Sequence, residues 1–148
     1  MKDIGRSAIR GLVFDKDGTL FDFNATWAAW CAGLIAQLSH GDPARAAAVA
    51  EALQYDLASG RFARTSVVIA QTMDVVIDHI HAALPDRDWT MLRAEVMEAT
   101  TRAQQVPVTP LAPLLDRLAG AGLTLGLATN DGETPARAHL ARAGILDR

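Results

Sequence analysis

Two aspartates, Asp15 and Asp17, directly follow the apolar run Leu12-Val13-Phe14. Such a run fits a buried strand of a parallel sheet, and ligands of open α/β sheets bind just beyond the carboxyl ends of the strands. Gly18 then permits a backbone conformation that other residues resist. A carboxylate in this place can attack phosphorus and form an aspartyl-phosphate. A second carboxylate can protonate the leaving oxygen and later deprotonate the attacking water.

Crowded carboxylates also favour a hard cation with oxygen ligands, and Mg²⁺ is the usual choice beside phosphate. An acidic turn that only caps a strand is the alternative interpretation of an isolated Asp-x-Asp pair. The pattern here is longer, because Gly18-Thr19-Leu20, an aromatic residue and Asp22 follow the pair. This longer pattern favours the chemical interpretation.

The segment from Arg10 to Phe23 resembles the first motif of the haloacid dehalogenase-like hydrolases, and of their phosphoglycolate phosphatase-like members in particular. The resemblance implies that Asp15 is the nucleophile and Asp17 the general acid and base. It also implies that Asp15, together with the backbone carbonyl of Asp17, holds Mg²⁺. Dehalogenases of the family lack the second acid, so Asp17 argues for phosphoryl transfer to water or between sugar hydroxyls.

Composition narrows the function classes further. Half of the 148 residues are hydrophobic, and the formal net charge of −3 gives no support for a nucleic-acid partner or a basic membrane patch. No segment resembles a signal peptide and no apolar run approaches membrane-spanning length, so we expect a soluble cytoplasmic protein. The lone Cys31 excludes an internal disulfide, and its apolar helical surroundings predict a buried, inert thiol.

Helical spacing of apolar residues dominates residues 24–105, where we expect no strand. Helices are predicted to begin at an N-cap on Asn24, at Pro43, at Ser66 and at Asp86 or Asp88. The resemblance identifies residues 23–106 as an inserted helical cap domain. Residues 1–22 and 107–148 then form an α/β core of the Rossmann-like parallel-sheet type. Such a cap closes over the strand ends and excludes water.

Within the predicted cap, two pairs of residues bear on the site. Trp27 and Trp30 lie on one apolar helical face, and we interpret them as core residues rather than as pocket lining. Arg61 and Arg64 lie on a Gly-containing loop and could reach an anionic group of a substrate. Solvated loop arginines are the alternative.

A second strand is predicted at residues 123–128, after a helix that Thr109 caps. The strand ends at Thr129-Asn130, which resembles the second motif of the family. A hydroxyl and backbone N–H groups at a strand end can bind phosphate oxygens. We therefore expect Thr129 to bind the transferred phosphate, Asn130 to support it through its amide, and Gly18 to contribute from the first turn.

The resemblance covers two of the four family motifs. The family pattern continues with a lysine that neutralises the nucleophile and with paired acids that complete the Mg²⁺ site. Here no lysine follows Lys16, and no pair of acids follows Gly144. We do not give Lys16 the missing role, because adjacent residues of an extended chain point to opposite sides. Only two strands are predicted from the sequence, which leaves an incomplete core with exposed sheet edges. We therefore expect this chain to be the N-terminal part of a longer phosphatase, or a natural truncation.

The sequence thus predicts a Mg²⁺-dependent phosphatase acting on a small phosphorylated metabolite, with phosphoglycolate as the first substrate to try. Two alternatives stay open. One is a phosphomutase with the same first motif, and the other is a catalytically silent module that binds phosphate. Pairing of exposed sheet edges in a dimer is a further hypothesis.

Overall fold

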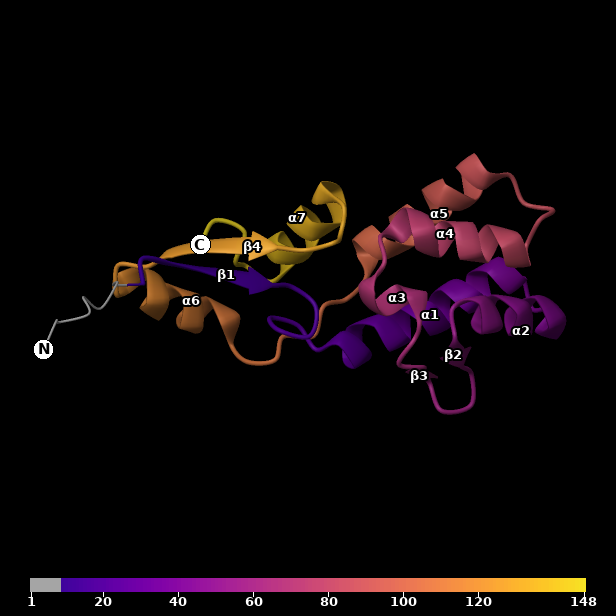
Figure 1. Ribbon diagram of the computed structural model, residues 1–148, viewed down its shortest axis with the longest axis horizontal. Helices are drawn as coiled ribbons and strands as arrows, with labels where there is room; N and C mark the ends of the chain where they lie inside the picture. Colours follow the sequence, from indigo (N-terminus) through magenta and orange to yellow (C-terminus); the bar gives the residue numbers. More distant parts are fainter. Residues whose placement is uncertain (1–8) are drawn as a thin grey trace, which may run out of the picture.

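The computed structural model describes residues 9–148 as a mixed α/β chain with a small parallel sheet. Residues 1–8, which we assigned to the core, lie outside the described part. Figure 1 shows two parts side by side along the long axis, one holding the parallel sheet and the other mainly helices. Two clusters of buried apolar side chains correspond to them. We use the words core and cap for these two parts.

The core is built on two strands, β1 (Gly11–Asp15) and β4 (Thr124–Ala128), which pair in parallel from Gly11 opposite Thr124 to Asp15 opposite Ala128. Helix α6 (Leu111–Gly120) precedes β4, and helix α7 (Glu133–Arg142) follows it. The predicted strands are therefore confirmed. The order strand, crossover, parallel strand brings the two carboxyl ends to one edge of the sheet.

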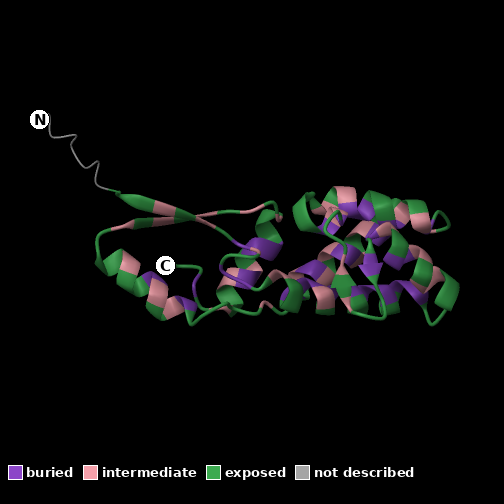
Figure 2. Cartoon of the chain, turned by 60° about the horizontal axis from the view of Figure 1, so that its bottom comes forward, coloured by how far each residue is buried: buried purple, intermediate pink, exposed green. Residues whose placement is uncertain are grey.

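The prediction that β1 is buried is wrong, because only one face of the sheet is covered. Phe14, Leu125 and Leu127 pack against a cluster that includes Leu111 and Leu115 of α6. On the opposite face, Val13 is 73% exposed. Figure 2 shows the same contrast between a thinly buried sheet and a densely buried cap. A short apolar run predicts a strand, but it does not predict whether one or both faces of the sheet are covered.

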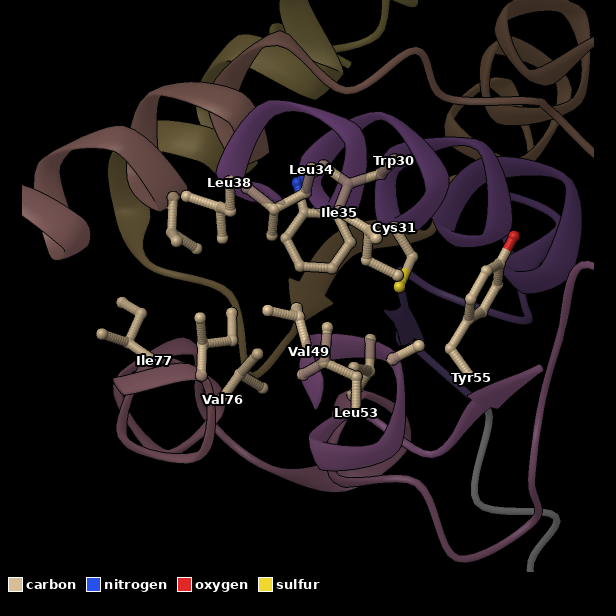
Figure 3. Close-up of a cluster of buried hydrophobic side chains, with 14 of the residues drawn as sticks. Trp30, Cys31, Leu34, Ile35, Leu38, Val49, Leu53, Tyr55, Val76 and Ile77 are labelled. Carbon is tan, nitrogen blue, oxygen red and sulfur yellow. The ribbon is translucent and has the colours of Figure 1, made fainter. Parts of the chain in front are cut away.

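The cap contains five helices among the described residues: α1 (Phe23–Ser39), α2 (Pro43–Ala52), α3 (Val67–Ala70), α4 (Met73–Ala83) and α5 (Trp89–Arg102). Their apolar faces enclose one cluster, in which Leu34, Leu38, Val49, Leu53 and Ile77 have almost no exposed surface (Figure 3). Side chains of α1 and α2 meet those of α4 there. The helical periodicity of residues 24–105 is thus confirmed as a packed helical unit.

Two local predictions in the cap are wrong. Residues 24–105 do contain strands, because β2 (Tyr55–Asp56) and β3 (Arg61–Phe62) pair as a short antiparallel hairpin. The helix expected from Ser66 to Leu84 is divided into α3 and α4, because Gln71 is extended, with φ −95° and ψ 162°. Apolar spacing continues across that break, so periodicity alone cannot reveal it.

Polar side chains set the helix starts. Asp22, rather than the expected Asn24, caps α1, and its Oδ1 accepts from the backbone N–H of Ala25 at 2.8 Å. Asp88 caps α5 as expected, accepting from the N–H of Met91 at 2.9 Å. Such caps satisfy backbone donors that have no partner within the helix.

Two linkers join core and cap and run side by side. The N–H of Val108 donates to the carbonyl of Leu20 at 3.1 Å, and the N–H of Asp22 donates to that of Val106 at 2.7 Å. Helix α7 adds a second junction, because Arg142 donates to the carbonyl of Ala103 at 3.2 Å, just after α5. A cation at this place satisfies carbonyls that the end of α5 leaves free. No described helix combines the length and the apolarity needed to cross a bilayer.

Candidate active site

The parallel register places the two predicted site turns next to each other. Asp15 is the last residue of β1, and its register partner is Ala128, the residue before Thr129. The carboxylate of Asp15 is exposed at this edge, and its Oδ1 accepts from the backbone N–H of Lys16 at 2.8 Å. The sequence-predicted nucleophile and the predicted phosphate-binding hydroxyl thus follow neighbouring strand ends.

The turn after Asp15 reverses the chain tightly. The carbonyl of Lys16 accepts from the N–H groups of Leu20 and Phe21, both at 3.0 Å. Gly18 sits at φ +82°, a conformation that side chains with a Cβ resist. Its own N–H donates to the carbonyl of Phe21 at 2.8 Å. In this structure Gly18 therefore shapes the turn, and its N–H is already engaged within it.

Lys16 does not follow the side-chain directions expected of an extended chain, because its Nζ turns to Asp17 and Asp131. That it does not take the role of the missing family lysine stays a prediction. The side chain of Lys16 is fully buried, and its Nζ lies 2.8 Å from Oδ2 of Asp17. The expectation of extended geometry fails because the chain leaves the extended conformation at Lys16, where the turn begins. The same Nζ lies 3.3 Å from the side-chain oxygen of Gln105 and within 5.8 Å of the ring centroid of Phe21. A buried ammonium is stabilised by such neighbours.

Asp131 is a site residue that the sequence analysis did not single out. Its Oδ2 lies 3.1 Å from Nζ of Lys16, and its side chain is only 7% exposed. Burial by itself would raise the pKa of Asp131, but the neighbouring His139 and the charge of Lys16 outweigh it, so the pKa lies below its usual value. In the sequence, Asp131 stands out only as an acid two residues after Thr129. Acids are common in turns, so this position alone does not indicate a site residue.

His139 supports this network from α7. It is fully buried, its Nε2 lies 2.8 Å from the carbonyl of Thr100 in α5, and its Nδ1 lies 3.6 Å from Oδ2 of Asp131. The shorter distance is a hydrogen bond and the longer one is a contact between polar groups. One buried imidazole therefore bridges the second site turn and the cap.

Trp27 belongs to the site as well as to the buried cluster of the cap. It is buried in the cap cluster, as the sequence predicted, but its indole N–H donates to Oδ1 of Asp17 at 2.8 Å. Asp17 thus accepts from Lys16 of the core and from Trp27 of the cap. Helical spacing predicted only packing for Trp27, because it does not reveal the partner of the indole nitrogen.

The second turn differs from expectation at one position. Oγ1 of Thr129 accepts from the N–H of Asp131 at 3.2 Å. The side-chain amide of Asn130 donates to the carbonyl of Gln71 at 2.8 Å, in the segment between α3 and α4. Asn130 therefore links the core to the cap here, and its expected support of Thr129 stays a prediction.

The two predicted cap arginines lie away from these turns. Arg61 is exposed on β3, where it is the register partner of Asp56 and lines an open depression with Tyr55 and Phe62. Arg64 follows the hairpin and is also exposed. Neither lines the cleft between the cap and the turns that carry Asp17 and Asp131.

The acidic side chains at the strand ends do not form a metal cage by themselves. Within residues 9–148, no three His, Cys, Asp or Glu side chains gather to hold an ion. Asp15 offers an exposed carboxylate, whereas both oxygens of Asp17 receive donors from Lys16 or Trp27. A cation at this edge would therefore take side-chain oxygen from Asp15 and further ligands from elsewhere.

The sequence model of the haloacid dehalogenase-like hydrolases matches residues 9–148. The chain belongs to this family. Comparison with curated protein sequences gives no match. Among solved structures, the L-2-haloacid dehalogenase of Xanthobacter autotrophicus is similar, with 22% identity and a TM-score of 0.51 over 94% of this chain and 54% of that one. The form of that enzyme with chloropropionic acid covalently bound gives 21% identity, the same TM-score and the same coverage.

These likenesses bear on the fold of this haloacid dehalogenase-like hydrolase. The chain spans about half the length of the dehalogenases it matches, at 54%. Its parallel strand pair and inserted helices agree with an incomplete core of the family fold. The family match gives the fold, and the reaction of this chain is argued from the site below.

Proposed function

We propose that this hydrolase is a Mg²⁺-dependent phosphatase that cleaves a small phosphomonoester through an aspartyl-phosphate. One observation carries the proposal: the exposed carboxylate of Asp15 ends β1 beside the strand end that Thr129 follows, and Asp17 stands two residues away. A nucleophile, a proton carrier and a hydroxyl for phosphate thereby share one edge of the sheet.

The reaction balances with these groups. A carboxylate oxygen of Asp15 attacks phosphorus, the bond from phosphorus to the leaving oxygen breaks, and Asp17 gives that oxygen a proton. Water then attacks the aspartyl-phosphate, Asp17 takes the water's proton, and phosphate leaves as Asp15 is restored. In the structure Oδ1 of Asp17 accepts from Lys16 and from Trp27.

The presence of Asp17 separates this proposal from carbon–halogen hydrolysis. A halide departs as a stable anion and needs no proton, whereas an alkoxide leaving group does. The similar dehalogenases are less than 25% identical to the chain, so they support the fold and not the substrate. A proton carrier fixed beside the nucleophile favours cleavage of a phosphate ester.

Mg²⁺ fits the oxygen ligands at the strand end. Asp15 would supply a carboxylate oxygen and Asp17 its backbone carbonyl, because the carboxylate of Asp17 already binds Lys16 and Trp27. Mg²⁺ commonly takes one or two protein carboxylates and completes its shell with water and substrate phosphate. Bound there, it would offset the charge that builds on the phosphoryl oxygens.

The test is phosphate release from p-nitrophenyl phosphate and from small alkyl phosphates, by the 148-residue chain with Mg²⁺. We expect release that needs both Mg²⁺ and Asp15 and that disappears in Asp15→Asn. The exposed Asp147→Asn variant is the matched control and should keep full activity. Chloride release from 2-chloropropionate, with none from phosphate esters, would contradict the proposal.

A further inference from the structure

A cleft lies where the cap meets the two site turns. Its core side carries Asp17, Asn130 and Asp131. Its cap side carries Gln71 and six apolar residues, which we call the apolar wall: Phe23, Trp27, Val68, Ile69, Met73 and Val76. The space between the two sides is about 20 Å³, roughly room for one water molecule. A leaving group placed in this cleft therefore lies against its cap side.

The charges around this cleft have one sign. Among its lining residues in the described part of the chain, Asp17 and Asp131 carry the charge, and both are acids. Lys16 lies buried beneath them and is already bound to both. Arg61 lines a separate depression on the cap hairpin. A second anionic group on a substrate would thus face two carboxylates whose neighbouring side-chain cation, Lys16, is already paired with them.

The apolar wall has surface left to cover. Ile69 is 42% exposed, and Phe23 and Met73 are only half-buried. These residues come from three different helices and face the same cleft as Asp17. Covering such surface with an apolar group is favourable by about 25 cal/mol per Å². The wall therefore favours a carbon chain or ring over a carboxylate.

We infer that the substrate is a phosphate monoester of an uncharged, largely apolar alcohol, and not a phosphorylated carboxylic acid such as phosphoglycolate. The inference rests on the proposed phosphatase function and names its substrate class. In the reaction, the ester and water give the neutral alcohol and inorganic phosphate. The alcohol leaves along the apolar wall with the proton that Asp17 supplies.

Binding and turnover test this separately. Butylphosphonate and phosphonoacetate are stable analogues that share the phosphonate group and differ in the apolar or anionic end. With Mg²⁺ present, their affinities are read from the indole NMR signal of Trp27 in the labelled chain. We expect butylphosphonate to bind at least about tenfold more tightly, since each buried CH₂ contributes to the difference. Equal affinities, tighter binding of phosphonoacetate, or no binding of either overturns the inference.

A pair of variants locates the effect. Ile69→Lys places a cation on the exposed part of the wall, and we expect it to shift the preference toward phosphonoacetate by about tenfold. Leu57→Lys, at a residue 52% exposed and outside the cleft, should leave the preference unchanged. An unchanged preference in Ile69→Lys overturns the assignment of this wall.

Turnover distinguishes failure of the substrate class from failure of the reaction. Selective binding of butylphosphonate without phosphate release from any ester supports the substrate class and contradicts the hydrolysis. Faster release from phosphoglycolate than from butyl phosphate, measured as kcat/KM, supports the hydrolysis and overturns the substrate class.

Discussion

The ammonium of Lys16 lies 3.1 Å from the carboxylate of Asp131, so a buried ion pair ties the turn after β1 to the turn after β4. The same ammonium binds Asp17 at 2.8 Å. One cation therefore holds Asp17, the proposed proton carrier, against the turn that also carries Thr129. Its burial makes each of its partners costly to remove singly.

Removing this cation should strongly destabilise the chain. Lys16→Met leaves two largely buried carboxylates without their cation, and we expect it to lower the free energy of unfolding by about 3–5 kcal/mol. Asp131→Asn should cost less in that background than in the wild type, with a coupling of about 0.5–3 kcal/mol. Urea unfolding of the four proteins measures the coupling. Strictly additive losses would show that the ion pair does not stabilise the fold.

The same aspartate predicts a specific response to acid. Because the folded-state pKa of Asp131 lies below its usual value of 3.8, the carboxylate stabilises the fold above that value. This contribution is lost as the pH falls through the folded-state pKa. Between about pH 5 and pH 3, the wild type should lose more unfolding free energy than Asp131→Asn, as measured by urea titration. Parallel pH profiles would contradict the assignment, and Asp147→Asn serves as the exposed control.

Two glycines with open surroundings should respond oppositely to alanine. A Cβ at Gly18 or at Gly33 would meet no described atom within 4 Å, so backbone conformation alone decides the effect. Gly18 has φ +82°, and Gly18→Ala should cost about 1–2 kcal/mol. Gly33 lies inside α1, and Gly33→Ala should stabilise by roughly 0.5–1 kcal/mol. Thermal or urea unfolding checks both, and a neutral Gly18→Ala would speak against the left-handed turn.

Cys31 should report on unfolding of the cap. It is fully buried, and burial raises the pKa of its thiol from 9.0 to about 12. At a given pH this lowers the thiolate fraction about a thousandfold, and the thiolate is the reactive form. We expect almost no reaction with a disulfide reagent at pH 8 in buffer and complete reaction in urea. Rapid labelling in buffer would mean that the cap opens around α1.

The sequence was sufficient to predict those elements that the local pattern of apolar residues determines. The apolar runs before Asp15 and Thr129 predicted two strands, and the register of β1 and β4 confirms that their ends are neighbours. Helical spacing likewise predicted the packed cap. Both features follow from the period of the apolar residues.

The local sequence pattern does not predict contacts between segments that are distant in the chain. The bond from Trp27 to Asp17 joins cap and core, and the contact of Lys16 with Asp131 joins residues more than a hundred positions apart. The divided helix at Gln71 and the hairpin at Tyr55 depend on single backbone angles and on packing. Periodicity carries no information on either.

The most direct test of the account is whether a phosphoryl group becomes attached to Asp15. The 148-residue chain is mixed with Mg²⁺ and butyl phosphate, quenched with acid, digested and analysed by mass spectrometry. We expect the peptide containing Asp15 to gain the mass of one phosphoryl group, and the corresponding peptide of Asp15→Asn to gain none. Phosphate release without this adduct, or an adduct that persists in Asp15→Asn, would contradict it.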